Sequence, residues 1–224
     1  MHVAGEQEYW LVQTGVGPEK ARRCAARLLD HQSFSLMIST GFACALIAVG
    51  IGALLVGHEV VSSGREGPAS VSPIDVPGEA RDRLVRYIQA IVPAVHMGRF
   101  VSTDVVIGSA LEKRVFADKT QAIGLDMESA ALATEANRTR TPFVIIRTVS
   151  DLLDEDLPLD FNLFLRPTGW LKGIGSVLAA PSCLIGINRL RRQSGVAAEA
   201  LTVFFRQYAA TMIHRRQEHR STPM

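Results

Sequence analysis

A short run of apolar, strand-forming residues late in the chain constrains the fold more than any other feature. Residues 143–146 read Phe-Val-Ile-Ile, they follow Thr-Pro, and they lead to Ser150 and Asp151. A continuous β-rich apolar run is typical of a strand that is covered on both faces. In an open α/β sheet the ligand lies beyond the carboxyl ends of the strands, so Ser150 and Asp151 stand where a site is expected.

The rest of the chain alternates strands and helices in the way that such a sheet requires. We predict strands over residues 8–13, 35–40, 56–62, 97–102, 121–125 and 143–148. We predict helices over residues 18–30, 78–92, 109–117, 127–138 and 196–212. This alternation indicates an α/β sandwich. In the last helix the apolar residues recur at helical spacing, which favours a role in the core; they are Leu201, Phe204, Phe205 and Tyr208.

Length and charge limit the classes of protein to be considered. The chain has 224 residues, which is the size of one ordinary domain. Lys and Arg number 24 against 22 Asp and Glu, so no strong charge points to an anionic partner. Basic residues cluster only in 189–192 and 214–220, without interleaved aromatic residues. We interpret these clusters as a solvated helix face and a chain end, not as a nucleic-acid site; attraction to an anionic membrane is the alternative.

The cysteines and histidines indicate neither disulfides nor a metal. Cys24, Cys44 and Cys183 are scattered without pairing or metal spacing, which favours a reducing compartment. The six histidines are dispersed, and the acidic segment 152–158 has no His or Cys beside it. No secretory signal opens the chain. We therefore expect a cytoplasmic protein without a metal or another cofactor.

The uncharged run Phe34–Gly57 raises the alternative of a membrane span, because about 20 apolar residues can cross a bilayer as a helix. Four glycines interrupt this run, at positions 41, 50, 52 and 57. Two buried strands joined by a loop explain it better. A membrane-associated protein remains the main alternative from a different class.

Two dipeptides resemble those of a known enzyme family. Met127–Glu128 opens a predicted helix and Ser150–Asp151 ends a predicted strand, as in the purine nucleoside phosphorylase and nucleosidase superfamily. Four more segments are similar to that family and stand in its order: 11–21 (strand, Gly-x-Gly turn and helix), 38–46 (Gly-rich base-binding loop), 56–61 and 98–107. The resemblance implies a three-layer α/β sandwich around a central, mixed and twisted sheet. It also implies one nucleoside phosphorylase-like domain over residues 1–213, followed by a disordered basic tail over 214–224.

The resemblance implies a role for each of these residues. Glu128 would accept hydrogen bonds from the ribose hydroxyls, Met127 would contact the sugar or base, and Asp151 would protonate nitrogen 7 of a purine. Breaking an N-glycosidic bond leaves an oxocarbenium-like sugar and an anionic base, so both carboxyl groups favour the transition state. A carboxyl that donates a proton has to stay protonated, which apolar surroundings favour. Further substrate contacts are implied at Ser150, Phe42, Ala43, Val106 and Ile107.

Two departures from the family pattern bear on the reaction. Phosphorylases hold phosphate with an Arg before the Gly-rich loop and a Ser within it, where this chain has Ser39 and Phe42. Without a guanidinium at that place, water is favoured over phosphate as the nucleophile. The chain also reaches Gly15-Val16-Gly17 without the strands and Glu-rich turn that precede it in the family. We therefore expect a truncated N-terminus that lacks the carboxylate of that turn.

Residues 160–188 are rich in apolar side chains and contain Pro167 and Pro181. Two interpretations stay open for this segment. It is part of the core, or it is an apolar wall for a ligand tail or a patch for peripheral membrane contact. The second fits a hopanoid-associated subgroup of the family, whose members remove adenine from a lipid-linked adenosine.

The leading function is therefore a nucleosidase that uses water to release adenine from an adenosine-type nucleoside. The alternatives are a phosphate-dependent nucleoside phosphorylase and a truncated, non-catalytic nucleoside-binding or membrane-associated protein. The resemblance implies a small-molecule nucleoside as the partner. It also implies a homo-oligomer, because family members usually assemble as dimers or hexamers.

Overall fold

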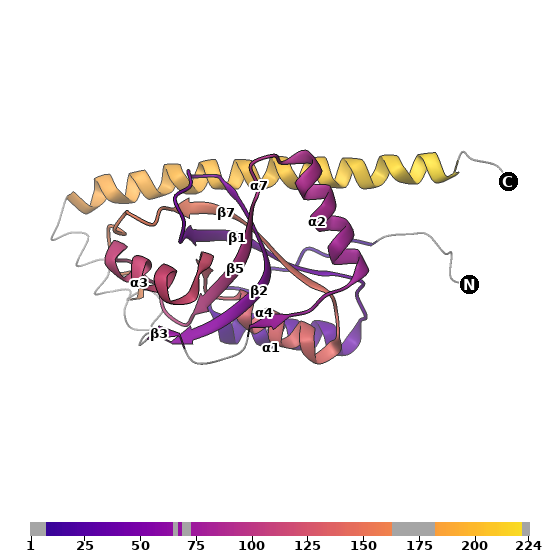
Figure 1. Cartoon of the computed structure of the whole chain (residues 1–224), viewed down its shortest axis with the longest axis horizontal. Coiled ribbons are helices and arrows are strands. Elements are labelled where there is room, and N and C mark those ends of the chain that lie inside the picture. The colour runs from indigo at the N-terminus through magenta and orange to yellow at the C-terminus, as the bar shows by residue number, and fades with distance from the viewer. Residues whose placement is uncertain (1–7, 65–66, 69–72, 163–181, 221–224) are drawn as a thin grey trace.

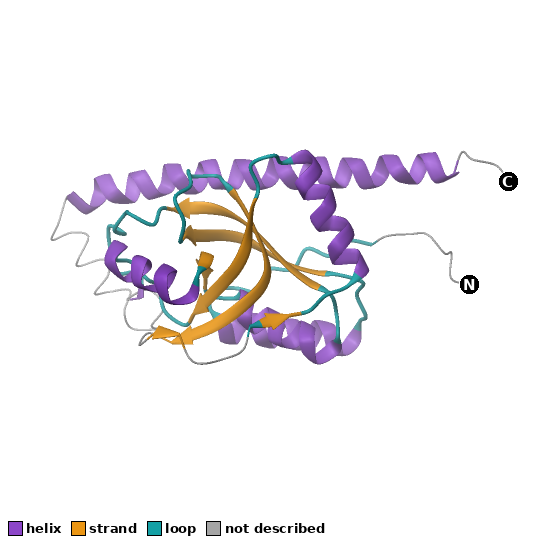
Figure 2. Cartoon of the chain, viewed as in Figure 1, coloured by secondary structure: helices purple, strands orange, loops and turns teal. Residues whose placement is uncertain are grey.

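The strands of this protein form one mixed sheet with helices on opposite sides of it (Figures 1 and 2). The computed structural model describes residues 8–64, 67–68, 73–162 and 182–220. The strands are β1 (Met37–Ala45), β2 (Leu54–Gly64), β3 (Gly67–Pro68), β4 (Ile74–Asp75), β5 (His96–Thr103), β6 (Ala122–Asp126) and β7 (Phe143–Asp151). The helices are α1 (Pro18–His31), α2 (Glu79–Ile91), α3 (Ala110–Thr120), α4 (Ser129–Thr139) and α7 (Ser182–Arg220).

The sheet is mixed and it closes on itself. Its strand order is β3-β2-β5-β6-β1-β7, and β7 pairs again with β2. The pairs β1–β7, β2–β5 and β5–β6 are parallel, whereas β1–β6 and β2–β7 are antiparallel. The predicted α/β architecture around a central mixed sheet is confirmed. The closure, which no local pattern predicts, leaves β7 hydrogen-bonded on both edges.

Alternate residues of β7 face two different parts of the core, as the apolar run predicted. Phe143 and Ile145 belong to a cluster with small residues of α1 and α4. Val144 and Ile146 belong to another cluster, with apolar residues of α2 and α7. In Figure 1 these helix pairs lie on opposite sides of the sheet. The strand is therefore covered on both faces, and its carboxyl end is held in place.

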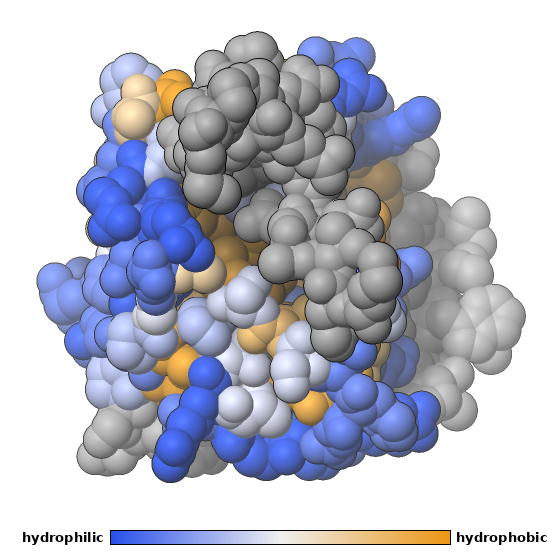
Figure 3. Space-filling view, turned by 90° about the vertical axis from the view of Figure 1, so that its right-hand side faces the viewer, coloured by the Kyte–Doolittle hydropathy of each residue, from blue (hydrophilic) through white to orange (hydrophobic). Residues whose placement is uncertain are grey.

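The long helix α7 runs along one side of the sheet and extends beyond it (Figure 1). Phe204 is buried against β2 and β7, and Leu201, Phe205 and Tyr208 pack on the same cluster, so the predicted core role of this helix is confirmed. The helix is longer than predicted and continues through 214–220, where we expected a basic tail. Figure 3 shows the end of the molecule that lies on the right in Figure 1, where apolar side chains are visible in a hollow beside hydrophilic ones.

Two sequence-based predictions of secondary structure are wrong. The strand predicted at 8–13 is absent. This segment has no regular structure, because no strand of the sheet pairs with it, and its Leu11 is 94% exposed. The Gly-rich segment predicted as a loop is part of β1 up to Ala45. Residues 163–181, which carry most of the apolar segment 160–188, lie outside the described residues.

The uncharged run Phe34–Gly57 supplies β1 and the start of β2, as the preferred interpretation required. Within the described part of the chain, no helix combines the length and the apolar character that crossing a membrane needs.

Phe100 in β5 depends on two glycines in the neighbouring strands. Its ring is fully buried, and a Cβ atom would lie 2.6 Å from it at Gly57 and 2.8 Å from it at Gly124. We expect Gly124→Ala to lower the free energy of unfolding by about 1–3 kcal/mol, because overpacking forces the ring or the strand to move. Urea denaturation measures this. Gly50→Ala is the matched control, since a Cβ there has open space; equal stability of the two variants would contradict the prediction.

Candidate active site

Strand pairing brings the predicted site segments together. Because β1 and β7 are parallel neighbours, Phe42 lies opposite Thr148 and Ala43 opposite Val149. A bulge follows, and Cys44 lies opposite Asp151. The Gly-rich segment therefore runs beside the strand that ends in Ser150 and Asp151. Phe42 is 40% exposed there, whereas Ala43 is buried.

A buried arginine that the sequence analysis missed lies beneath this segment. Arg147 Nη1 donates to the carbonyl oxygen of Phe42 at 2.9 Å, and Nη2 donates to Ser39 Oγ at 3.1 Å and Ser129 Oγ at 3.4 Å. Nε lies 2.7 Å from Asp126 Oδ2 as an ion pair, but it is not aligned for a hydrogen bond. A guanidinium therefore does lie next to Ser39 and Phe42. Both of its terminal nitrogens donate to the protein, whereas Nε has no hydrogen-bond partner among the described residues.

Asp126 fixes the start of helix α4. Its carboxylate accepts hydrogen bonds from Ser102 Oγ, from Ser129 Oγ and from the Ser129 amide, the last at 3.1 Å. Ser102 Oγ in turn accepts from the amide of Ala130 at 2.9 Å. These bonds satisfy amides of the first turn, which lack partners within the helix. Charged residues inside apolar strands are rarely buried without a partner, so Asp126 and Arg147 were recognisable in the sequence as a candidate pair.

Glu128 is held between the Gly-x-Gly turn and Arg147. Its Oε1 accepts a hydrogen bond from the amide of Gly17 at 2.9 Å, and its Oε2 lies 3.7 Å from Arg147 Nη2. Gly17 has a φ of 97°, which favours glycine. Burial raises the pKa of Glu128, while the Gly17 hydrogen bond and the charge of Arg147 oppose that shift. Met127 precedes it at the same helix start and is partly buried.

Asp151 has a charged partner instead of apolar surroundings. Lys113 from α3 donates from Nζ to Asp151 Oδ2 at 2.9 Å, and its side chain is not exposed at all. The same ammonium donates to the carbonyl oxygens of Leu152 and Glu155, at 2.9 and 2.8 Å. On the other side, Ser150 Oγ donates to Asp151 Oδ1 at 3.2 Å. Lys113 was not among the predicted site residues, because a lysine in a surface-type helix pattern gives no local sign of burial.

Cys44 lies beside this ion pair. Burial raises its thiol pKa well above the usual value, and the negative charge of Asp151 adds to the shift. The neutral thiol donates to the carbonyl oxygen of Ala45 at 3.3 Å, so its contacts are those of an unreactive core residue. Among the described residues, no group of three His, Cys, Asp or Glu side chains could hold a metal ion.

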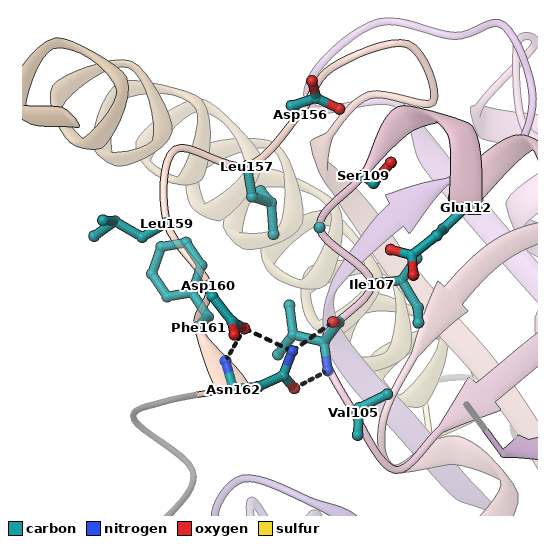
Figure 4. A pocket seen from close by; sticks show the side chains of 12 residues that line it. Val105, Ile107, Ser109, Glu112, Asp156, Leu157, Leu159, Asp160, Phe161 and Asn162 are labelled. Carbon is teal, nitrogen blue, oxygen red and sulfur yellow. Dashed lines mark hydrogen bonds between the residues drawn. The ribbon is translucent and has the colours of Figure 1, made fainter. Parts of the chain in front are cut away.

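The loop after β5 forms one wall of a cavity of about 350 Å³, shown in Figure 4. Val106 and Ile107, the two predicted base contacts, lie in this wall, and Ile107 is also buried in the core. Residues 156–162 form the opposite wall. The cavity falls in the lower part of the range of about 300–1,000 Å³ that is usual for small-molecule sites.

The family of the chain follows from its sequence. Residues 1–166, more than half of the chain, match the model of the phosphorylase superfamily. The chain belongs to this superfamily. Its mixed α/β fold with a central sheet agrees with this membership, and the predicted carboxylates follow β6 and end β7, the two strands that flank β1.

Solved structures of nucleosidases share this fold at low sequence identity. S-adenosylhomocysteine nucleosidase from Streptococcus pyogenes aligns with a TM-score of 0.59 and 18% identity, over 86% of this chain and 76% of that one. A putative 5'-methylthioadenosine/S-adenosylhomocysteine nucleosidase from Borrelia burgdorferi, bound to adenine, gives 0.55 and 20%, over 70% and 73%. Futalosine hydrolase from Helicobacter pylori gives 0.56 and 20%, over 74% and 78%.

The Lys113–Asp151 pair predicts a large effect of one substitution on stability. We expect Lys113→Met to lower the free energy of unfolding by about 3–5 kcal/mol, because Asp151 and two carbonyl groups then lose a buried partner. Urea denaturation at neutral pH measures this. The matched control is Lys119→Met on the exposed face of the same helix, which should change stability by about 0.5 kcal/mol or less. If Lys113→Met changed the free energy of unfolding as little as the control does, the Lys113–Asp151 pair would not be important for the stability of the fold.

Proposed function

We propose that this protein is a nucleosidase that cleaves the N-glycosidic bond of an adenosine-type nucleoside with water. The observation that supports this most is the presence of two carboxylates in different environments, one just after β6 and one at the end of β7, the two strands that flank β1. Glu128 is partly buried and contacts a backbone amide and Arg147, whereas Asp151 is paired with a lysine. Two carboxyl groups with different partners suit a reaction that needs one group at the sugar and another at the base.

In this proposal Glu128 binds the ribose. One of its oxygens is oriented by the Gly17 amide, and the other lies near Arg147 without a close hydrogen bond. That second oxygen is suited to accept from sugar hydroxyls. Met127 contacts the sugar or base, and Ser150 orients Asp151 through its hydroxyl. The negative charge of Glu128 also stabilises the positive charge that develops on the sugar ring.

Asp151 is the proposed proton donor to nitrogen 7 of the departing purine. Its Oδ2 is taken by Lys113, so Oδ1, next to Ser150, is the oxygen that faces the base. Phe42, Ala43, Val106 and Ile107 are the proposed walls around the base.

The engagement of Arg147 supports water over phosphate. A phosphate dianion is best held by a guanidinium with free donors. Here Nη1 and Nη2 donate to Phe42, Ser39 and Ser129, and the charge is offset by Asp126 and Glu128. Adding a dianion to two carboxylates would also be unfavourable.

Adenine is the proposed base. Among proteins of the same fold, one is described as bound to adenine and another as bound to 5-methylthiotubericidin. The cavity beside Val106 carries only acidic side chains among its charged lining residues, which favours a neutral base over a phosphorylated ligand. A non-catalytic nucleoside-binding protein is the second candidate, and the ion pair between Asp151 and Lys113 favours it, since Lys113 already binds one oxygen of the proposed proton donor.

Glu128→Gln should weaken binding of methylthioadenosine and leave binding of free adenine nearly unchanged. Loss of a charged hydrogen bond to the ribose costs about 1.5–3 kcal/mol, which is roughly 10- to 100-fold in affinity. Calorimetry with both ligands measures this, and Glu79→Gln, on an exposed part of α2, is the control. An equal loss of adenine affinity would show that Glu128 is not at the sugar.

The same variant tests the pKa of Glu128 through its stability. Because burial raises the pKa of this carboxyl, its protonated form stabilises the fold below the usual Glu pKa, and that stabilisation is lost as the pH rises through the raised value. Glu128→Gln should therefore gain thermal stability relative to the parent between pH 4 and pH 7. A constant difference in melting temperature over this range would contradict the raised pKa.

Product analysis separates the candidate functions. Incubation with methylthioadenosine should release adenine and a free sugar at a rate that phosphate does not change. Asp151→Asn should lower this rate by roughly 100-fold or more and keep substrate affinity, because the amide still forms hydrogen bonds but delivers no proton. A strict need for phosphate would show a phosphorylase. Binding without any product would favour the non-catalytic protein, and an unchanged rate for Asp151→Asn would remove Asp151 from the reaction.

A further inference from the structure

Asn162 makes a two-point contact with the backbone of Val106. The amide of Val106 donates to Asn162 Oδ1 at 2.7 Å, and Asn162 Nδ2 donates to the carbonyl oxygen of Val106 at 2.9 Å. Figure 4 shows both bonds on the wall of the cavity. One side-chain amide thus pairs with both the donor and the acceptor of this peptide edge.

The contact has the pattern of a bound base. A side-chain amide presents an acceptor next to a donor, and adenine presents a ring nitrogen that accepts next to an amino group that donates. Either group can satisfy the amide and carbonyl of one residue in an extended chain. The edge of Val106 therefore suits any planar ligand with neighbouring acceptor and donor, and Asn162 is its occupant in this structure.

The segment of Asn162 is attached to the opposite wall by other bonds as well. The amide of Leu157 donates to the carbonyl oxygen of Gly108 at 2.8 Å, and the amide of Ala110 donates to Asp156 Oδ1 at 2.7 Å. These bonds hold the two walls together without Asn162. Asp160 Oδ1 accepts from both the backbone amide and Nδ2 of Asn162, at 3.0 and 2.9 Å, and so points the amide at Val106.

The charges of the cavity restrict the ligand further. Its lining includes Glu112, Asp156 and Asp160 and contains no Lys or Arg. These negatively charged side chains repel phosphate groups and favour neutral or amino-bearing ligands. The cavity of about 350 Å³ leaves room for a small planar ring system beside the Val106 edge.

We propose that Asn162 is an internal competitor for this edge: the side-chain amide occupies the place of an adenine-type base and has to be displaced when the base binds. This inference rests on the proposed function only for the choice of adenine as the ligand. It assigns Asn162 a role in setting affinity that neither hydrolysis nor proton transfer requires.

Occupation of the Val106 edge by Asn162 lowers the observed affinity for ligands. A ligand can use the Val106 edge only in molecules in which Asn162 has left it. The observed affinity is therefore the intrinsic affinity multiplied by the fraction of such molecules. Removing the competitor therefore strengthens binding, although it also removes contacts from the protein. A variant that weakened binding would instead show that Asn162 supports the ligand.

Calorimetry with free adenine tests the proposal on the full chain. Asn162→Ala should bind adenine about tenfold more tightly than the parent, which corresponds to about 1.4 kcal/mol. Asn162→Asp keeps the size of the side chain but has no donor for the Val106 carbonyl and repels Asp160, so it should also bind more tightly. Asn137→Ala, on the exposed face of α4, is the matched control and should bind as the parent does.

Nuclear magnetic resonance supplies a second measurement. Saturating adenine should shift the side-chain amide signals of Asn162 in the parent protein and speed the hydrogen exchange of that amide. Unchanged signals at saturation, equal or weaker adenine binding by Asn162→Ala, or no adenine binding by either protein would each overturn the proposal. None of these measurements involves bond cleavage, so a failure of the nucleosidase proposal would be seen separately, as a lack of sugar product.

Discussion

The geometry of the site depends on the buried guanidinium of Arg147. It links the Gly-rich strand β1, through Ser39 and the carbonyl of Phe42, to Ser129 at the start of α4. A buried charge is very unfavourable unless it is paired, so Arg147 requires Asp126 and gains from Glu128. Strand β1, strand β7 and the start of α4 are thus attached to one group, and a change in this group would move Phe42 and Glu128.

The two proposed functional carboxyl groups differ because of what surrounds them. Glu128 loses water on burial, and its backbone hydrogen bonds and the charge of Arg147 offset this loss only in part, so its pKa rises. Asp151 has an ammonium in direct contact. The first arrangement keeps an acceptor ready for hydroxyl groups, and the second holds a carboxylate in a fixed position at the end of a strand. Fold and chemistry are coupled here, because both positions follow from where β6 and β7 end.

The elements of the fold were largely predictable from the sequence. The contacts within the site, apart from the candidate pair of Asp126 and Arg147, were not. The apolar run at 143–146 and the alternation of strands and helices have local causes. The predicted elements agree with the structure within a few residues, apart from the strand at 8–13, the Gly-rich segment that belongs to β1, and the long helix α7. The prediction of a strand at 8–13 was wrong because an apolar segment forms a strand only when another strand pairs with it. Arg147 and Phe42 are 105 residues apart in sequence, and Lys113 and Asp151 are 38 apart. Such contacts arise only when the sheet closes.

Helix α3 connects the two proposals for this site. Besides binding Asp151, Lys113 holds the carbonyl oxygens of Leu152 and Glu155. One turn earlier, the amide of Ala110 binds Asp156. The chain from Asp151 to Asp156 is therefore fixed to α3, and Gln193 of α7 adds a bond to Glu155. Displacement of Asn162 has to take place beyond this fixed part, so a base can enter at Val106 while the carboxyl group that would protonate it keeps its place.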